Sequence, residues 1–299
     1  MSKERTGFIG VGLMGHGMAG NLVDKGWPLT VMGHRNRKPV DDLVGRGASE
    51  AKTPREVAQN SDILFICVTG TPQVESLVRG PDGILEGVHE NLVVVDTSTA
   101  IPDSTMALAE ELKARGAAMA DAPLGGTPVQ AAAGELSAMV GADPEVFARI
   151  EPAIRAWAGR VVHLGAVGSG HKMKLLNNFL SLGYAAIYAE ALAVARKNGL
   201  SVETFDSVIR GSRMDCGFYQ TFMGYALEGN PEAHKFTLSN AHKDMRYMAA
   251  MANESGIANH IGAAVKNMFA FAEGIGRGQD YVPFLADIVA ESNGVKIKK

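Results

Sequence analysis

Gly7-Phe8-Ile9-Gly10-Val11-Gly12-Leu13-Met14-Gly15-His16-Gly17-Met18-Ala19 is the stretch of sequence from which the fold can be worked out. It starts as a short apolar strand, passes through a glycine-rich turn and opens a helical run over residues 14–23. A second strand is predicted over residues 28–32. Strand, turn, helix and strand in this order form a βαβ unit, the building block of a parallel α/β sheet.

The glycines of this stretch form a G-x-G-x-x-G motif. In a dinucleotide site the first glycine permits a tight turn, the second lets a pyrophosphate approach the backbone, and the third lets the helix pack on the strand. The helix then points its N–H groups and positive dipole end at the phosphates. A glycine-rich turn can also be purely structural, but the βαβ context favours a bound dinucleotide. The predicted contacts are Gly10, Gly12, Leu13, Met14 and Gly15.

Short apolar runs separated by helical segments continue through the first half of the chain. They lie at residues 7–10, 29–32, 63–68, 92–96, 117–120, 137–140 and 160–164. Continuous apolar strands of this kind are typical of a mostly parallel sheet that helices cover on both faces. The predicted fold class is therefore a doubly wound α/β domain of the Rossmann type, with its last strands as antiparallel additions.

The second half has a different pattern. A long apolar run with few helix breakers spans residues 171–198, and Gly199 can end it. Further helical patterns follow at residues 202–210, 215–227, 238–255 and 261–274, without strand alternation. We therefore predict a Rossmann domain over residues 1–165 and an all-helical domain over residues 166–299, joined by the long helix.

Composition narrows the possible functions. A chain of 299 residues favours two domains, and a net charge of −3 provides no basic surface for nucleic acid. With Cys67 and Cys216 as its two cysteines, a disulfide framework or a cysteine zinc site is not expected, and Cys67 is predicted to be a buried core thiol. We find no signal-peptide pattern at residues 1–5 and no apolar stretch of the ~18 residues that span a bilayer, so a cytoplasmic protein without a membrane partner is expected.

The end of the second strand indicates which dinucleotide is bound. An acid at this place binds the ribose hydroxyls of NAD, whereas an arginine accommodates the extra phosphate of NADP. Residues 32–38 contain no acid there, but they contain Arg35, Arg37 and Lys38. NADP(H) is therefore favoured and NAD(H) remains possible, while the alternative is a solvated basic loop. The predicted contacts in this loop are His34, Arg35, Asn36 and Arg37.

Residues that directly follow later strands are expected at the same edge of the sheet, because ligands bind at the carboxyl ends of parallel strands. Val68 and Thr69 follow the third strand and are predicted to line the adenosine side. Thr99 follows the fourth strand and is predicted to face the nicotinamide.

Three later segments complete a wider pattern. They are Asp121-Ala122-Pro123-Leu124-Gly125-Gly126-Thr127, Gly168-Ser169-Gly170-His171-Lys172-Met173-Lys174-Leu175-Leu176-Asn177-Asn178 and His242-Lys243-Asp244. Together with the N-terminal motif, they resemble the β-hydroxyacid dehydrogenase family, which includes 3-hydroxyisobutyrate dehydrogenases, tartronate semialdehyde reductases and sulfolactaldehyde reductases. The resemblance covers nearly the whole chain in the family's order and spacing.

The resemblance implies that Lys174 is catalytic. Asn177 and Asn178 follow at i+3 and i+4, so they share its helix face, where a cation and two amides can hold a hydroxyl and its developing alkoxide. In the implied reaction Lys174 exchanges a proton with the substrate oxygen as general acid/base, while hydride moves between the substrate carbon and nicotinamide. Asn178 orients Lys174 or the substrate oxygen, and Asn177 reaches the substrate's acid group. The alternative is an interdomain helix that simply carries these polar residues.

The predicted substrate loop departs from the family. The family's Ser-Gly-Gly, which holds the substrate carboxylate, reads Gly125-Gly126-Thr127 here. Sulfolactaldehyde reductases place an arginine at the middle position, where this chain has Gly126, although Ser181 matches a serine of that group. Gly125, Gly126, Thr127, Asn177 and Ser181 are predicted to bind the substrate, and Lys243 matches a family lysine near the cofactor.

The sequence thus predicts an NAD(P)-dependent oxidoreductase of a short 3-hydroxy acid or its semialdehyde, with no metal required. Family membership implies a homodimer or homotetramer. Two alternatives remain open at this stage. One is an imine reductase, an enzyme class that commonly lacks the helix lysine. The other is a non-catalytic dinucleotide-binding interaction protein, against which the retention of Lys174, Asn177 and Asn178 argues.

Overall fold

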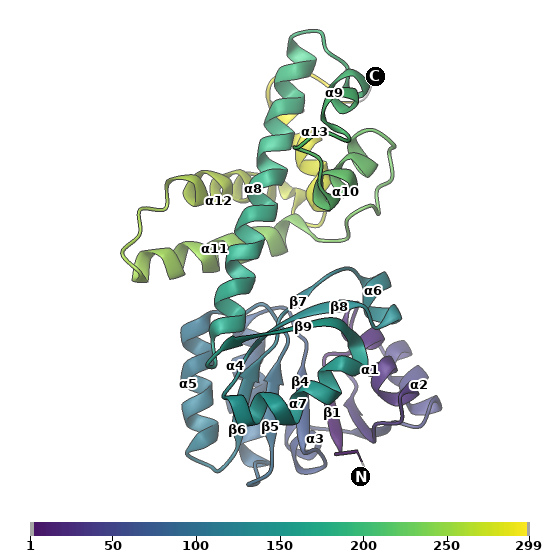
Figure 1. Ribbon diagram of the computed structural model, residues 1–299, viewed down its shortest axis with the longest axis vertical. Helices are drawn as coiled ribbons and strands as arrows, with labels where there is room; N and C mark the ends of the chain where they lie inside the picture. Colours follow the sequence, from purple (N-terminus) through teal and green to yellow (C-terminus); the bar gives the residue numbers. More distant parts are fainter. Residues whose placement is uncertain (1–2, 298–299) are drawn as a thin grey trace. The chain divides into compact units, whose positions relative to one another are not determined.

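The structure is a computed structural model that describes residues 3–297, and it divides after Lys174 into two compact units. All the described strands belong to the first unit, and the second is helical (Figure 1). The predicted boundary at residue 165 coincides with the end of the last strand at Gly165. The units divide slightly later because the first turn of the long helix is bonded to Asp121 in the first unit.

The first unit is built on a nine-stranded sheet in the order β3-β2-β1-β4-β5-β6-β8-β7, with β9 paired to β8. The six strands from β3 to β6 are parallel, which is the Rossmann strand order, whereas β8 runs antiparallel to β6 and β7. The predicted doubly wound fold is therefore confirmed. The strands are β1 (Thr6–Ile9), β2 (Leu29–Met32), β3 (Ser49–Ala51), β4 (Ile63–Ile66), β5 (Val93–Asp96), β6 (Ala118–Asp121), β7 (Leu124–Gly125), β8 (Leu136–Gly141) and β9 (Ala158–Gly165).

Helices cover both faces of this sheet (Figure 1). Successive strand residues point to opposite faces, so Phe8 and Phe65 join one core with Trp157, while Ile9 and Ile66 join the other. Both faces are apolar for this reason, and the strands read as continuous apolar runs. The helices are α1 (Gly15–Asp24), α2 (Lys38–Gly45), α3 (Pro54–Gln59), α4 (Thr71–Arg79), η1 (Ile84–Glu86), α5 (Pro102–Lys113), α6 (Pro128–Ala133) and α7 (Pro144–Trp157).

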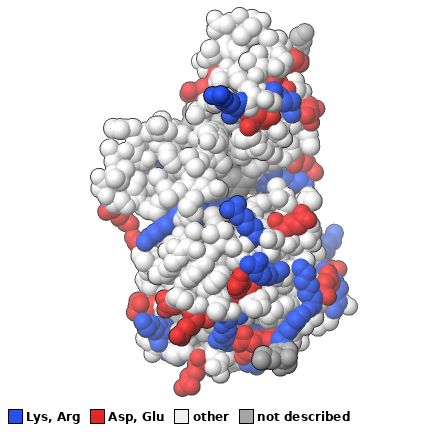
Figure 2. Space-filling model, viewed as in Figure 1, with Lys and Arg blue, Asp and Glu red and all other residues white. Residues whose placement is uncertain are grey.

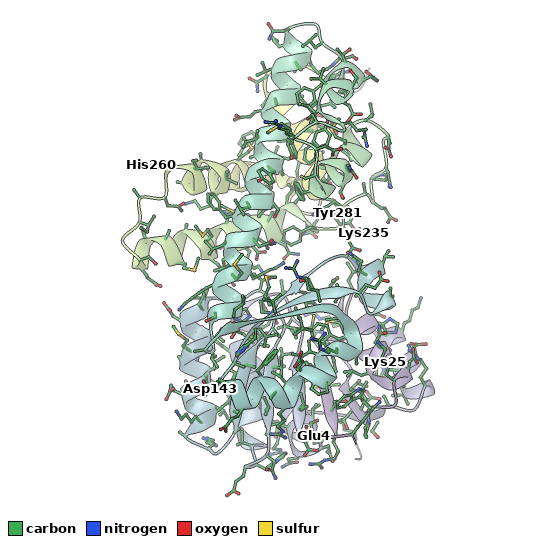
Figure 3. The ribbon with its side chains drawn as sticks, in the orientation of Figure 1. Glu4, Lys25, Asp143, Lys235, His260 and Tyr281 are labelled. Atoms are coloured by element: carbon green, nitrogen blue, oxygen red, sulfur yellow. The ribbon has the colours of Figure 1, made fainter. Side chains whose placement is uncertain are left out.

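Helix α7 is bonded to the amino-terminal edge of the sheet. Glu4, labelled in Figure 3, lies two residues before β1 and accepts a 2.8 Å hydrogen bond from Nε of Arg149 on α7. The same guanidinium donates to the Asn91 carbonyl at 2.6 Å. Ligand contacts are expected at the opposite edge, where the parallel strands end.

The second unit packs its helices around one apolar core that includes Leu182, Tyr219, Phe222 and Phe269, all at most 1% exposed. The long helix α8 (Ser169–Lys197) begins in the first unit and continues into the second. The other elements are α9 (Val202–Ile209), α10 (Gly217–Ala226), α11 (Leu238–Glu254), α12 (His260–Ala272), η2 (Glu273–Arg277), η3 (Val282–Phe284) and α13 (Leu285–Ser292).

Helix α8 corrects one expectation from the sequence. By length and composition it is apolar enough to cross a membrane, the one such helix within residues 3–297, so the expectation that no stretch reaches that length was wrong. Half of its most apolar window is buried inside the protein. That burial is the pattern of a core helix, whose apolar residues pack on neighbouring helices of the same unit.

Candidate active site

The glycine turn after β1 has the geometry that the motif predicts. Gly10 has φ +98°, and a Cβ there would lie 2.1 Å from the Cys67 carbonyl oxygen. A Cβ on Gly15 would lie 2.1 Å from the Gly10 carbonyl oxygen, so the third glycine lets α1 approach the strand. A Cβ on Gly12 would meet nothing within 4 Å. The first and third glycines therefore serve packing, and the second faces open space.

The amino end of α1 is not capped by a side chain. Met14, the N-cap residue, makes no side-chain cap hydrogen bond, and the first turn contains no acidic residue. The first N–H groups of a helix lack partners within the helix and carry its positive dipole end. The exposed Gly12 and Leu13 precede them. This turn fits the pyrophosphate of a dinucleotide, and it does so through backbone groups alone.

The two arginines after β2 differ in their surroundings. Arg37 is bound to two acids: its Nη2 donates to Asp41 Oδ1 at 2.8 Å and to Glu50 Oε2 at 3.0 Å. The Arg37 guanidinium holds the pKa of the Glu50 carboxyl below its usual range. Arg35 is exposed and has no side-chain partner among residues 3–297. The charge of Arg37 is therefore already balanced within the protein, whereas that of Arg35 is not.

The loops after β4 and β5 are tied together at the same edge of the sheet. The Val68 backbone N–H donates to Ser98 Oγ at 3.0 Å, and the Ser98 N–H donates to Asp96 Oδ1 at 2.9 Å. Val68 and Thr99 are half-buried and Thr69 is exposed. Since β1 pairs with β4 and β4 with β5, these loops lie beside the glycine turn.

The predicted substrate loop joins β7 to α6. Gly126 has φ +131°, and a Cβ there would lie 2.7 Å from Cδ2 of Leu136, so this backbone excludes an arginine without rearrangement. Thr127 is the N-cap of α6: its Oγ1 accepts from the Gln130 N–H at 3.4 Å, and its own N–H donates to Gln130 Oε1 at 2.9 Å. The Thr127 hydroxyl therefore has a capping role in this structure, and its predicted contact with substrate stays a prediction.

Lys174 lies beside this loop. Its Nζ donates to the Leu124 carbonyl at 2.6 Å, and Leu124 directly precedes Gly125. The position of Lys174 is fixed by the start of α8, where the N–H groups of Gly168 and His171 both donate to the Asp121 carboxylate at 2.6 Å. The segment that carries Lys174 is thereby bonded at both Asp121 and Leu124 to the segment in which substrate binding is expected.

The helical unit holds the remaining predicted polar residues. The Asn178 amide nitrogen donates to Asp244 Oδ2 at 2.6 Å, and both side chains are buried, at 6% and 2% exposure. Lys243 Nζ lies 3.1 Å from Asp244 Oδ1 and 5.5 Å from the centre of the Tyr247 ring. The Asn178–Asp244 pair was not predicted from the sequence, although Lys243 was. The feature that could have indicated a partner for Asn178 is Asp244 itself, an acid next to Lys243 in the middle of an amphipathic helix.

Asn177 and Ser181 lie close to Asn178 on α8. The exposed Asn177 donates from Nδ2 to Asn178 Oδ1 at 3.4 Å, and Ser181 Oγ donates to the Asn178 carbonyl at 3.2 Å. Lys174 and Asn178 are one helical turn apart, so α8 presents an amine and an amide on one face. Within residues 3–297 no group of three or more His, Cys, Asp or Glu side chains is arranged to hold a metal ion.

Comparison with models of protein families assigns the chain to a family. Residues 5–165 match the model for the NAD-binding domain of 6-phosphogluconate dehydrogenase. Residues 168–286 match the model for the NAD-binding domain of NADP-dependent 3-hydroxyisobutyrate dehydrogenase. The chain belongs to the β-hydroxyacid dehydrogenase family. As a member of this family it is an NAD(P)-linked oxidoreductase.

Known members of this family match along their full length. A 3-sulfolactaldehyde reductase of Escherichia coli (strain K12) is 29% identical over 291 residues, 97% of each chain. A 2-(hydroxymethyl)glutarate dehydrogenase of Eubacterium barkeri is 29% identical over 293 residues, 98% of this chain and 97% of that enzyme. The crystal structure of a 3-hydroxyisobutyrate dehydrogenase from Salmonella typhimurium has a TM-score of 0.85 at 25% identity, covering 96% of this chain and all of that one.

Proposed function

We propose that this β-hydroxyacid dehydrogenase transfers hydride between NADP(H) and a short 3-hydroxy acid or its semialdehyde, with Lys174 as the general acid/base. The observation that carries the proposal is the 2.6 Å hydrogen bond from Lys174 Nζ to the Leu124 carbonyl, directly before Gly125-Gly126-Thr127. An amine is thereby held next to the loop where a substrate acid group is expected. Lysine in an apolar helix is costly unless it has a partner or a function.

The proton and the hydride follow different routes in the proposed reaction. Nicotinamide supplies the hydride in reduction and accepts it in oxidation. In reduction the Lys174 ammonium donates its proton to the carbonyl oxygen of the substrate as the alcohol forms. In oxidation the neutral amine takes the hydroxyl proton. Lys174 must therefore exist in both protonation states during the proposed reaction.

Asn178 is proposed to orient the reacting oxygen. Its amide nitrogen is fixed by the buried Asp244 carboxylate, so the amide plane cannot rotate freely. Its Oδ1 faces Asn177 at 3.4 Å. Lys243 balances the charge of Asp244 from the other oxygen at 3.1 Å. Asp244 is therefore proposed as a positioning residue, and Asn178 as the residue that contacts substrate or Lys174.

The acid group of the substrate is proposed to bind to Gly125, Gly126 and Thr127 from one side and to Asn177 and Ser181 from α8. Because Gly126 has no side chain and the Thr127 N–H already donates to Gln130 Oε1, the backbone N–H groups of Gly125 and Gly126 are the proposed donors of the loop, and such groups suit carboxylate and sulfonate oxygens alike. The substrate class is therefore an acid-bearing alcohol or semialdehyde of either kind.

The preference for NADP(H) is proposed to come from Arg35. This arginine is the unpaired one of the two after β2, since Arg37 is bound to Asp41 and Glu50. A guanidinium without an internal partner suits a phosphate, which it can contact through two parallel hydrogen bonds. His34 and Asn36 are exposed on either side of it.

Self-association through α8 is also proposed. Large apolar side chains recur at i+3 and i+4 along this helix and are exposed: Leu176, Leu180, Tyr184, Ile187 and Val194. In Figure 2 the visible face of the helical unit is largely uncharged. An apolar stripe of this length is typical of a helix that packs on a partner. Ile187→Glu is expected to reduce the mass measured by light scattering, whereas Val208→Glu, an exposed apolar residue of α9, leaves it unchanged. Equal masses for wild type and I187E contradict this surface.

The experiment that tests the function is a titration of the purified protein with NADPH and NADH by fluorescence, followed by a screen of semialdehydes with the tighter cofactor. We expect tighter binding of NADPH and oxidation of NADPH by a carboxylate or sulfonate semialdehyde in the cytoplasmic pH range. Turnover of cyclic imines instead would favour the imine reductase hypothesis. Binding of the dinucleotide without turnover of any of these compounds would favour a non-catalytic protein.

A further inference from the structure

A histidine that takes no part in the proposed mechanism is buried between two carboxylates in the first unit. His171, Asp96 and Asp121 all have 0% exposure. His171 Nε2 lies 3.8 Å from Asp96 Oδ2, and its Nδ1 lies 3.8 Å from Asp121 Oδ2. The two acids are direct register partners at the carboxyl ends of β5 and β6. His171 belongs to the first turn of α8, one turn before Lys174.

The hydrogen bonds of the His171 ring indicate which protonation state of the ring uses every contact. Nε2 lies 3.1 Å from the Ser98 carbonyl oxygen, which can only accept, so Nε2 carries a proton. Nδ1 lies 2.8 Å from Thr105 Oγ1, and that hydroxyl lies 3.2 Å from the Ile101 carbonyl. If the ring is an imidazolium, Nδ1–H donates to Thr105 and the Thr105 hydroxyl donates to Ile101. In the neutral ring the hydroxyl must turn to Nδ1, and the Ile101 carbonyl keeps only its bond from the Thr105 backbone N–H at 3.1 Å.

Charge balance favours the same form. Burying two carboxylates side by side is costly unless a cation compensates them. Asp96 Oδ1 accepts from the Ser98 N–H, but Asp96 Oδ2 is buried without a hydrogen-bond partner and faces the His171 ring at 3.8 Å. Burial raises the pKa of the Asp121 carboxyl, and the positive charge of His171 opposes that rise. The groups that face the ring are Asp96 of β5, the loop after it, Thr105 of α5 and Asp121 of β6.

We propose that His171 is a positioning residue that stays protonated and clamps the first turn of α8 to the ends of β5 and β6. The clamp has two parts. The backbone N–H of His171 donates to Asp121 at 2.6 Å, and its ring bonds the loop after β5 through the Ser98 carbonyl. Lys174 follows one turn later, so the clamp fixes where the amine lies. This last consequence depends on the proposed function of Lys174, whereas the charge state of His171 does not.

The charge state is tested by nitrogen NMR of protein labelled at histidine, with the His171 signals assigned from His171→Gln. We expect both ring nitrogens of His171 to show the shifts of an imidazolium at pH 7.5. His163 provides the reference, because its Nε2 also faces a backbone carbonyl, that of Ala142 at 2.7 Å, but it makes no ion pair with a carboxylate. Shifts of a neutral ring for His171 would overturn the proposal.

A charge-balance series tests the clamp. His171→Gln removes the cation, and we expect a lower melting temperature and a fall in kcat of about 10- to 100-fold, the size of a displaced catalytic group, with little change in KM. Asp96→Asn added to H171Q removes one of the uncompensated acids, so melting temperature and kcat should partly recover. His163→Gln is the control for the loss of a histidine ring: it removes the stacking on Phe147 and the bond to the Ala142 carbonyl, so it is expected to lower the melting temperature but to leave kcat unchanged. If Asp96→Asn lowers both further, or if H171Q leaves kcat unchanged, the clamp is wrong.

The same series separates the clamp from the proposed function. If wild-type protein turns over no semialdehyde, the proposed function fails, while the ring shifts and the recovery of melting temperature in the double variant still decide the charge balance. If wild-type protein turns over its substrate but H171Q does so at the wild-type rate, the positioning role fails and the function stands.

Discussion

The first two glycines of the turn after β1, Gly10 and Gly12, are expected to respond differently to the same substitution. In Gly10→Ala, an alanine must adopt the φ of +98° that Gly10 has, and this left-handed backbone costs about 1–2 kcal/mol. Its Cβ would also lie 2.1 Å from the Cys67 carbonyl oxygen, an overlap that costs about 1–3 kcal/mol to relieve. We therefore expect G10A to lower the free energy of unfolding by about 2–5 kcal/mol. Gly12→Ala meets no atom within 4 Å and should change it by less than about 0.5 kcal/mol.

Urea unfolding and NADPH titration of the same variants separate these effects. G12A should fold normally and yet bind NADPH at least about tenfold more weakly, or about 1.4 kcal/mol, because its methyl group occupies the approach of the pyrophosphate. Gly47→Ala is the control for backbone strain alone, since Gly47 has φ +107° and open space around it. The amount by which G10A lowers the free energy of unfolding more than G47A does is then the cost of the overlap with Cys67. Wild-type NADPH affinity in G12A would refute the placement of the dinucleotide at this turn.

Two further predictions concern charge and thiol chemistry. Arg35→Ala should weaken NADPH binding by about 1.5–3 kcal/mol and leave NADH binding unchanged, because it removes a charge-assisted bond to the extra phosphate. Arg37→Ala should weaken NADPH binding less. Fluorescence titration of both variants tests this, and a larger loss of NADPH affinity in R37A would contradict the assignment of Arg35. Cys67 is half-buried, and desolvation raises the pKa of its thiol to about 11, so it stays protonated and unreactive at pH 8 and gains reactivity only as pH rises toward that value. The exposed Cys216 reacts instead. Titration with a chromogenic disulfide should show one fast thiol per chain, and two fast thiols would contradict the raised pKa of Cys67.

The sequence predicted the central strands because each is buried on both faces and is therefore apolar throughout, as in Ile63–Ile66. It missed β3, an edge strand whose Ser49 and Glu50 are exposed, because no apolar run marks a strand with one partner. It missed β7, a two-residue strand that contains Gly125. It also missed α13, which begins two residues after Pro283, where a break rather than a helix is expected.

The glycine turn was predictable because its geometry depends on neighbouring residues. The contacts that position the other site residues are not local. Asn178 and Asp244 are 66 residues apart in the chain, and Arg37 and Glu50 are 13 apart across two strands. Only the fold brings these groups together, so from the sequence alone Arg35 and Arg37 were equivalent candidates, and Asp244 and His171 had no assigned role. Pairing of side chains across elements depends on topology and packing, which composition and periodicity leave open.

The measurement that tests the account most directly is the kcat of Lys174→Ala on the semialdehyde that wild-type protein reduces, followed by the loss of NADPH absorbance. The account predicts a loss of about 10²–10⁴-fold in kcat, the usual size of a general acid's contribution, with NADPH affinity unchanged. Lys172→Ala, an exposed lysine of the same helix turn, should retain wild-type kcat. A K174A variant that keeps its kcat, or one that loses no more activity than K172A, would contradict the assignment of Lys174 as the proton donor.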